Sequence, residues 1–303
     1  MKTLIALTML ASLSFAQESG WQPLWQPKEN TPGYDAAMPP ENYPDAEHVT
    51  NVHLPEYRVF LPEGESDKPR PAVCIFPGGG YQNLALTKEG EEIGRWLASQ
   101  GFVGMAVKYR VSADGKHPEA FPHQLMDARR AIRTLRAHAK EWNVDPNKIG
   151  VIGFSAGGHL AALATTWKDD VPGETKDTID KESPATGFAM LIYPVISMDK
   201  PYVHGGSKNA LLGQAKDAEL VKKCSPYLQV TRQTPPLFVV QSADDGVSAL
   251  NSLDMVRAAQ EKGVPVEYHL YRKGGHGYGM RKQNKPTDAW PQEAEKWLKQ
   301  FKQ

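Results

Sequence analysis

"KIGVIGFSAGGHLAALAT", residues 148–165, joins a strand pattern to a helix pattern through a single serine. It begins as a short apolar strand, places Ser155 between Gly153 and Gly157, and continues as an alanine-rich helix. A sharp strand-to-helix turn lifts the serine clear of the sheet, and only glycine avoids a clash two positions away on either side. The pattern therefore predicts a nucleophile elbow, with the Ala156 N–H at the helix start as a donor to developing negative charge. An incidental serine in a glycine-rich turn is the alternative, and the flanking strand and helix disfavour it.

Apolar strand patterns alternate with helical patterns on both sides of the elbow. Strands are expected at 56–62, 71–77, 102–110, 148–154, 187–195, 236–243 and 265–275, and helices at 91–101, 123–142, 157–165, 249–263 and 289–301. This alternation is typical of an α/β fold with a mostly parallel sheet covered by helices on both faces. Residues 166–186 and 197–232 fit the pattern poorly, so we expect insertions or loops over the carboxyl edge of the sheet.

The composition argues against nucleic-acid binding, a disulfide scaffold and a metal site. The 303 residues include 35 Lys and Arg and 35 Asp and Glu, so the formal net charge is zero and nucleic acid is not an expected partner. Only Cys74 and Cys224 are present, too few for a disulfide scaffold, and both are predicted to be unpaired thiols. The spacing of His and Cys suggests no metal site, and no cofactor is expected.

The first 16 residues predict export. One lysine precedes the apolar run Leu4–Phe15, and Ser14 and Ala16 occupy the small-residue positions of a cleavage site. This is the pattern of a secretory signal peptide cleaved after Ala16. The apolar run is too short for a stable membrane anchor, so the mature form is expected to be secreted or periplasmic, with no membrane anchor.

The remaining chain divides into two parts. Residues 17–50 are rich in Pro, Gln, Asn and Trp and show neither a helical nor a strand period. They predict an extended arm held on the body by Trp21 and Trp25. Residues 51–303 carry the regular alternation and are predicted to form the catalytic domain.

A nucleophilic serine needs a base and an acid. His276 lies in "KGGHGYG", a glycine-rich loop after the last predicted strand, and "LFVVQSADDGV" ends a strand in Asp244 and Asp245. The order Ser, Asp, His is that of the elbow enzymes. Asp245 lies one residue later, before a Gly-Val turn, and is the predicted partner of His276, whereas Asp244 would brace or cap the loop. His159 lies one helical turn below Ser155 and is predicted to be structural.

"CIFPGGGY" ends an earlier predicted strand in Gly78, Gly79 and Gly80. Residues without side chains let backbone N–H groups approach a substrate oxygen, which favours an oxyanion hole. A phosphate loop is the alternative, but the Lys-Ser/Thr pair of such loops does not follow.

The chain resembles the α/β-hydrolase superfamily over roughly residues 50–303. More closely it resembles secreted bacterial acetylxylan or carbohydrate esterases, near the hormone-sensitive-lipase-like branch. The resemblance rests on "FPGGGY", "KIGVIGFSAGGHLAA", "LIYPVISM", "HGGSKNALLG", "CSPYLQVTRQTPPLFVVQSADDGV" and "YRKGGHGYGMR". It implies the nucleophile, base and acid at Ser155, His276 and Asp245, and an oxyanion hole at Gly79, Gly80 and Ala156.

The chain departs from the lipase-like pattern in two places. Pro77 stands where that branch has histidine, and Gln241-Ser242 replaces the usual start of the acid loop. The related carbohydrate esterases often share the proline, so activity is still expected. The second departure leaves the choice between Asp244 and Asp245 less fixed than the other roles.

These features predict a secreted serine carboxylic-ester hydrolase that removes short acyl groups, O-acetyl above all, from xylan or a related polysaccharide or oligosaccharide. No amphipathic lid is visible, and the insertions carry polar and aromatic residues such as Trp167 and those of 201–209. A serine peptidase of the same fold is one alternative, disfavoured because no gating domain is visible. A non-catalytic carbohydrate-binding protein is the other, disfavoured because every catalytic part is present in order.

Overall fold

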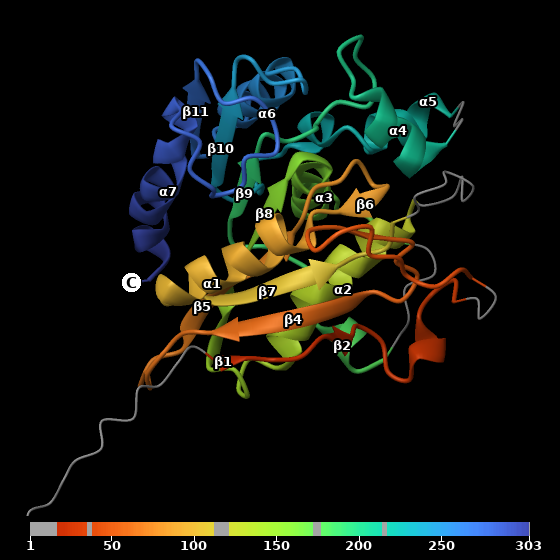
Figure 1. Cartoon of the computed structure of the whole chain (residues 1–303), viewed down its shortest axis with the longest axis vertical. Coiled ribbons are helices and arrows are strands. Elements are labelled where there is room, and N and C mark those ends of the chain that lie inside the picture. Colours follow the sequence, from red (N-terminus) through yellow and green to blue (C-terminus); the bar gives the residue numbers. More distant parts are fainter. Residues whose placement is uncertain (1–16, 35–37, 112–120, 172–176, 214–216, 303) are drawn as a thin grey trace, which may run out of the picture.

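A nine-stranded, mostly parallel sheet forms the centre of the molecule (Figure 1). This computed structural model describes residues 17–34, 38–111, 121–171, 177–213 and 217–302. The strands of the sheet are β1 (Gln17–Glu18), β2 (Gln22–Pro23), β4 (Glu56–Leu61), β5 (Arg70–Phe76), β7 (Val103–Lys108), β8 (Val144–Phe154), β9 (Ala189–Ile192), β10 (Leu237–Ser242) and β11 (Val266–Tyr271). Their order is β1-β4-β7-β5-β8-β9-β10-β11, and β2 also pairs with β4. From β7 to β11 all pairs are parallel, as predicted for an α/β fold.

Helices cover both faces of the sheet. The α-helices of the described residues are α1 (Glu92–Ser99), α2 (His123–Ala137), α3 (Ser155–Thr166), α4 (Gly205–Leu212), α5 (Ala218–Lys223), α6 (Leu250–Glu261) and α7 (Trp290–Leu298). One core packs α1 and α7 against the sheet, with Trp96 and Trp290 in edge contact. The other core packs α2, α3 and α6 on the opposite face, through residues such as Leu125, Leu160 and Met255 (Figure 1).

Burial explains the apolar runs of the central strands. Every residue of β7, β9 and β10 is buried, because helices cover both sides of these strands. The last strand, β11, lies at the sheet edge and is mostly half-buried. The parallel direction brings the carboxyl ends of β5, β8 and β10 to one edge, where the loops that carry chemistry meet.

The stretch predicted as an extended arm also contributes strands. β1 and β2 pair antiparallel with β4, and β3 (Val49–Thr50) pairs with β6 (Asn83–Leu84) in a separate ribbon. Trp25 is 2% exposed, and Trp21 packs against the core. The arm is therefore part of the sheet edge and of the core. The predicted signal peptide, residues 1–16, lies outside the described residues.

Most boundaries differ from the sequence prediction by a few residues, with two of the larger differences at the end of α2 and the start of β8. Helix α2 ends at Ala137 rather than at 142, because the backbone leaves helical geometry at His138, where ψ is 15°. Strand β8 begins at Val144, before the predicted start at 148; Val144 is buried, whereas Pro146 and Asn147 are exposed. The predicted insertion at 197–232 holds the two short helices α4 and α5.

Both cysteines are buried free thiols, as predicted. Burial raises the pKa of Cys74 and raises that of Cys224 to about 12, so both are inert as nucleophiles. Within the described ranges, we find no helix of the length and apolarity that a membrane span requires.

Candidate active site

Ser155 lies on a strained turn between β8 and α3. Its φ is 52°, in the left-handed region that side chains other than glycine rarely adopt. A Cβ on Gly153 would lie 2.0 Å from the Gly157 carbonyl oxygen, and one on Gly157 would lie 2.1 Å from the Phe76 carbonyl oxygen. Both contacts are with backbone and cannot be relieved by a side-chain rotation. The two glycines are therefore required by space, as the elbow pattern predicts.

The structure brings Ser155, His276 and Asp245 into one hydrogen-bonded line. His276 Nε2 lies 2.7 Å from Ser155 Oγ, and His276 Nδ1 lies 2.8 Å and 2.9 Å from the two Asp245 carboxylate oxygens. Since a carboxylate only accepts hydrogen bonds, Nδ1 carries the proton. Nε2 then presents its lone pair to the serine hydroxyl, which is the arrangement that general-base activation of a nucleophile needs.

Adjacent aspartates hold different parts of this site. The Asp245 side chain is fully buried and also accepts hydrogen bonds from the Val247 N–H at 2.7 Å and the Gln241 amide at 3.0 Å. Asp244 instead accepts the N–H groups of Gly274 and Gly275 at 2.8 Å and 2.9 Å. These two bonds lower the pKa of Asp244. Asp245 thus faces the imidazole, while Asp244 holds the loop that carries it.

The loop after β5, residues 77–81, forms a second wall of the site, and we call it the glycine loop. Its carbonyls turn inward: Pro77 O accepts from the Tyr109 hydroxyl, Gly78 O from the Ala85 N–H, and Gly79 O from the N–H groups of Gln82 and Asn83. Gly79 has a φ of 137°, and a Cβ there would lie 1.9 Å from the Asn83 carbonyl oxygen.

The N–H groups of Gly79 and Gly80 are left free to donate. Among the hydrogen bonds of the described residues, none uses either group. Both glycines line the same pocket as Ser155, and Ala156 follows Ser155 in the first turn of α3. This arrangement can hold an oxyanion, which is the role predicted for the three residues.

His159 lies away from the triad. Its ring is fully buried, with Nδ1 2.7 Å from the Tyr81 hydroxyl and Nε2 2.8 Å from the Cys224 carbonyl. Burial lowers its pKa to about 4, so the neutral ring donates through Nε2 and accepts through Nδ1. It joins α3, the glycine loop and the end of α5.

A pocket of about 490 Å³ opens onto Ser155 and His276. Five polar or charged side chains are among its lining residues: His48, Asn83, Lys88, Glu89 and His204. Ala85 and Val247 are the only apolar side chains among the described residues that line it. His204 comes from the 201–209 segment, whose polar and aromatic residues the sequence analysis noted. Trp167 does not line the pocket; it packs on Phe121, with ring centroids 5.5 Å apart.

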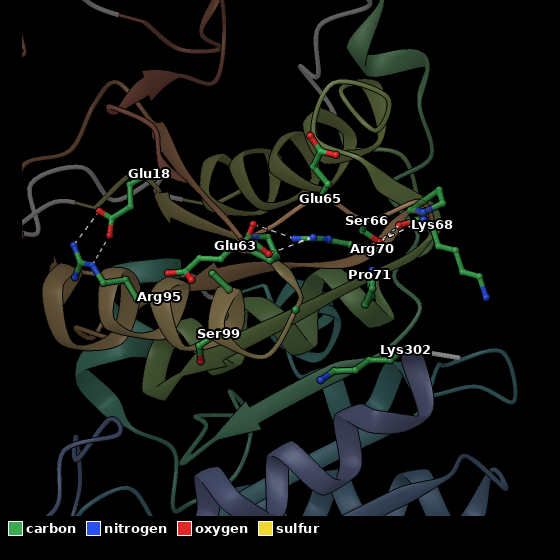
Figure 2. A pocket seen from close by; sticks show the side chains of 14 residues that line it. Glu18, Glu63, Glu65, Ser66, Lys68, Arg70, Pro71, Arg95, Ser99 and Lys302 are labelled. Carbon is green, nitrogen blue, oxygen red and sulfur yellow. Dashed lines mark hydrogen bonds and ion pairs between the residues drawn. The ribbon is translucent and has the colours of Figure 1, made fainter. Parts of the chain in front are cut away.

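A larger hollow, of about 970 Å³, lies apart from the triad, near β1, the start of β5 and the end of α1 (Figure 2). Several of its charged side chains form internal bonds: Arg95 pairs with Glu18 at 2.6 Å (Figure 2), and Arg70 donates to the carbonyls of Pro62 and Gly64. The hollow contains no histidine or cysteine. Size alone therefore does not identify the reactive site.

Three side chains of the site were not predicted from the sequence. Gln241 donates to Asp245 and to the Val247 carbonyl, and Glu89 and Tyr193 are hydrogen-bonded to each other behind the glycine loop. Gln241 had a detectable signal, since it is a polar residue in an otherwise apolar strand. Glu89 lies in none of the quoted stretches, and Tyr193 lies in "LIYPVISM", where the sequence analysis gave it no role. Among the described residues, no group of three or more His, Cys, Asp or Glu is arranged to hold a metal.

The chain is similar to known proteins in both sequence and structure. Residues 58–258 match the BD-FAE family. An acetyl ester-xyloside bifunctional hydrolase from Caldicellulosiruptor lactoaceticus has a similar structure, with a TM-score of 0.79 and 35% identity, over 93% of this chain and 96% of that one.

Two curated relatives are longer proteins. An acetylxylan esterase of Xylanibacter ruminicola is 33% identical over 79% of this chain and 47% of its own length. Endo-1,4-beta-xylanase B of Butyrivibrio fibrisolvens is 31% identical over 70% of this chain and 33% of its own length. The chain thus spans about half and about a third of these relatives.

Proposed function

The chain belongs to the BD-FAE family of α/β hydrolases, and on that premise we propose that it is a serine carboxylic-ester hydrolase that removes acetyl groups from xylan or a related polysaccharide. The observation that carries the proposal is the line of hydrogen bonds from Asp245 through His276 to Ser155. The similarity to an acetyl ester-xyloside hydrolase and to an acetylxylan esterase supports the substrate class.

The proposed reaction uses each group in turn. Ser155 Oγ attacks the acetyl carbonyl carbon while its proton passes to His276 Nε2. The N–H groups of Gly79, Gly80 and Ala156 hold the negative oxygen of the tetrahedral intermediate. Collapse breaks the bond between the carbonyl carbon and the sugar oxygen, which takes the proton from His276 and departs as a hydroxyl, leaving an acetyl group on Ser155. Water, deprotonated by the same imidazole, then releases acetate.

The lining of the pocket supports a short acyl group and a polar alcohol. A long acyl chain gains affinity by burying methylene groups, at about 0.8 kcal/mol each. Ala85 and Val247 offer little surface for such burial, whereas His48, Lys88 and His204 can form hydrogen bonds with sugar hydroxyls. We therefore expect kcat/KM to fall as the acyl chain lengthens.

The test is acetate release from acetylated xylan, together with kcat/KM on p-nitrophenyl esters from two to eight carbons, for the wild type and Ser155→Ala. We expect release of acetate, an optimum at the short end, and a loss of turnover of about 10⁶ in the variant. A correctly folded variant that kept a tenth of the wild-type rate would exclude Ser155 as the nucleophile. An optimum at eight carbons without acetate release would exclude the polysaccharide substrate.

The same assay separates the alternatives. A serine peptidase of this fold would cleave a dipeptidyl p-nitroanilide panel faster than the esters, and a carbohydrate-binding protein without activity would turn over neither. We also propose export, supported by the signal-like start at residues 1–16. Expression of the full chain followed by fractionation and N-terminal sequencing should find a mature form that starts at Gln17.

A further inference from the structure

A buried carboxyl group lies directly behind the glycine loop. Glu89 is 3% exposed, and its Oε2 accepts the Gly78 N–H at 2.7 Å. Its Oε1 accepts the hydroxyl of Tyr193 at 2.8 Å. The reaction proposed above uses neither residue. Each oxygen of this carboxyl therefore holds a different segment of the chain.

Tyr193 extends the contact to the loop that carries the base. Its hydroxyl accepts the Gly279 N–H at 2.9 Å, and its ring meets the His276 ring edge-on, with centroids 4.9 Å apart. Burial raises the pKa of Tyr193 well above its usual range, so the hydroxyl keeps its proton and can donate to Glu89. The Trp290 indole anchors the far side by donating to the Gly279 carbonyl at 2.8 Å.

Both residues lie on unusual backbone. Glu89 lies in a π-helical turn, Thr87–Glu91, just before α1. Tyr193 follows β9 with a φ of 38°, in the left-handed region that residues with side chains rarely adopt. π-helical turns and positive φ values persist where the surroundings enforce them, and both are frequent at functional sites. Here the hydrogen bond between Glu89 and Tyr193 joins the π-helical turn to the residue with positive φ.

We propose that Glu89 and Tyr193 form a positioning pair that sets the oxyanion donors against the catalytic imidazole. Gly78 is the link on one side, because a Cβ there would lie 2.9 Å from the Ser155 Cβ. A shift of Gly78 would therefore move the free N–H groups of Gly79 and Gly80 relative to the serine. Gly279 is the link on the other side, three residues after His276. The inference deepens the proposed function and rests on it.

The variants are Glu89→Gln, Tyr193→Phe and the double variant. A glutamine amide has one acceptor oxygen, so it cannot accept the Gly78 N–H and the Tyr193 hydroxyl through two separate oxygens. Tyr193→Phe keeps the ring against His276 but removes the hydroxyl that joins Glu89 to Gly279. Kinetics on p-nitrophenyl acetate are expressed per active serine, titrated with a fluorophosphonate, so that loss of folded protein does not count.

We expect each single variant to lower kcat by about 10- to 100-fold, with KM within about threefold, since one deleted oxyanion donor costs about 10²–10³. The inhibition constant of a trifluoromethyl ketone, whose adduct carries an oxyanion, should rise in parallel with the loss of kcat/KM. The double variant should cost little more than the worse single one, because both break the same bridge.

Two control variants match the chemistry. Tyr278→Phe removes a hydroxyl that is buried without a partner among the described residues, on a ring 4.5 Å from that of Tyr193. Glu92→Gln removes a carboxylate three residues from Glu89 that pairs with Arg281 at the surface. Both should keep kcat. Unchanged kcat per titrated serine in Glu89→Gln and Tyr193→Phe, or equal losses in the controls, overturns the positioning pair alone. A wild type without esterase activity overturns the proposed function and this inference with it.

Discussion

Two neighbouring aspartates in the loop after β10 have different partners and therefore different importance for catalysis. Asp245 Oδ1 lies 2.8 Å from His276 Nδ1, whereas Asp244 Oδ1 accepts two backbone N–H groups of the following loop. An asparagine at 244 keeps an oxygen that can accept both groups. An asparagine at 245 either loses the bond to the imidazole or turns its amide toward Nδ1 and stabilises the wrong tautomer.

We therefore expect Asp245→Asn to lower kcat by about 10⁴, as the same change does in serine proteases, and Asp244→Asn to lower it by less than about tenfold. Kinetics of both purified variants on p-nitrophenyl acetate decide the assignment, with thermal unfolding to check that both fold. The greater loss in Asp244→Asn would reverse the two roles.

Among the elements around the site, α3, the glycine loop and the end of α5 are joined by the neutral ring of His159. It lies on α3, accepts from Tyr81 of the glycine loop and donates to the Cys224 carbonyl at the end of α5. Raised pKa values keep Tyr81 and Cys224 protonated near neutrality, so neither supplies a charge that could stabilise imidazolium. Protonation of the ring would bury an uncompensated charge and break the bond from Tyr81.

This bridge predicts a loss of stability in acid. The folded pKa of about 4 lies below the unfolded value of about 6.5, so the unfolded chain binds more protons between these limits and stability falls as pH falls. From pH 7 to pH 5 the contribution of His159 is about 2 kcal/mol. Urea unfolding at both values should show the wild type losing about that much more than His159→Gln, which can keep both hydrogen bonds. Equal losses in the two proteins would contradict a buried neutral ring.

The sequence predicted the elements that carry strong periodicity and missed those that depend on distant contacts. The central strands and α3 were found because their runs of apolar residues and the space around Gly153 and Gly157 leave little choice. The first residues of β8 were missed, since Asp145, Pro146 and Asn147 have low strand propensity and lie in an irregular stretch between two pairs with β5, Val144 with Arg70 and Ile149 with Ala72.

The same contrast holds for the residues of the candidate site: those in local motifs were predicted, and those that meet through distant contacts were not. The triad and the oxyanion loop lie in motifs whose spacing follows from local geometry. Glu89 and Tyr193 lie 104 positions apart in the chain, and their contact exists only because the sheet brings β5 and β9 to one edge. No local pattern encodes such a pair.

At the scale of the whole molecule, the N-terminal arm completes the sheet and the core. β1 and β2 cover the open edge of β4, which would otherwise present unpaired backbone groups to other chains. Trp25 is 2% exposed and lies between the guanidinium groups of Arg110 and Arg130, which are 5.6 Å and 5.4 Å from its ring. Arg130 also donates to the Leu24 carbonyl at 3.0 Å.

These contacts predict that the arm supports global stability. Trp25→Ala should lower the free energy of unfolding by about 3–5 kcal/mol, because it opens a cavity and leaves two buried arginines without an aromatic face. Trp25→Phe should lose less, since a ring remains. Tyr43→Ala, in the same arm but 58% exposed, should change the free energy by under about 0.5 kcal/mol. Denaturant unfolding of the three variants measures these differences. If Trp25→Ala were as stable as Tyr43→Ala, the arm would be an appendage, and β4 would be able to serve as the sheet edge without it.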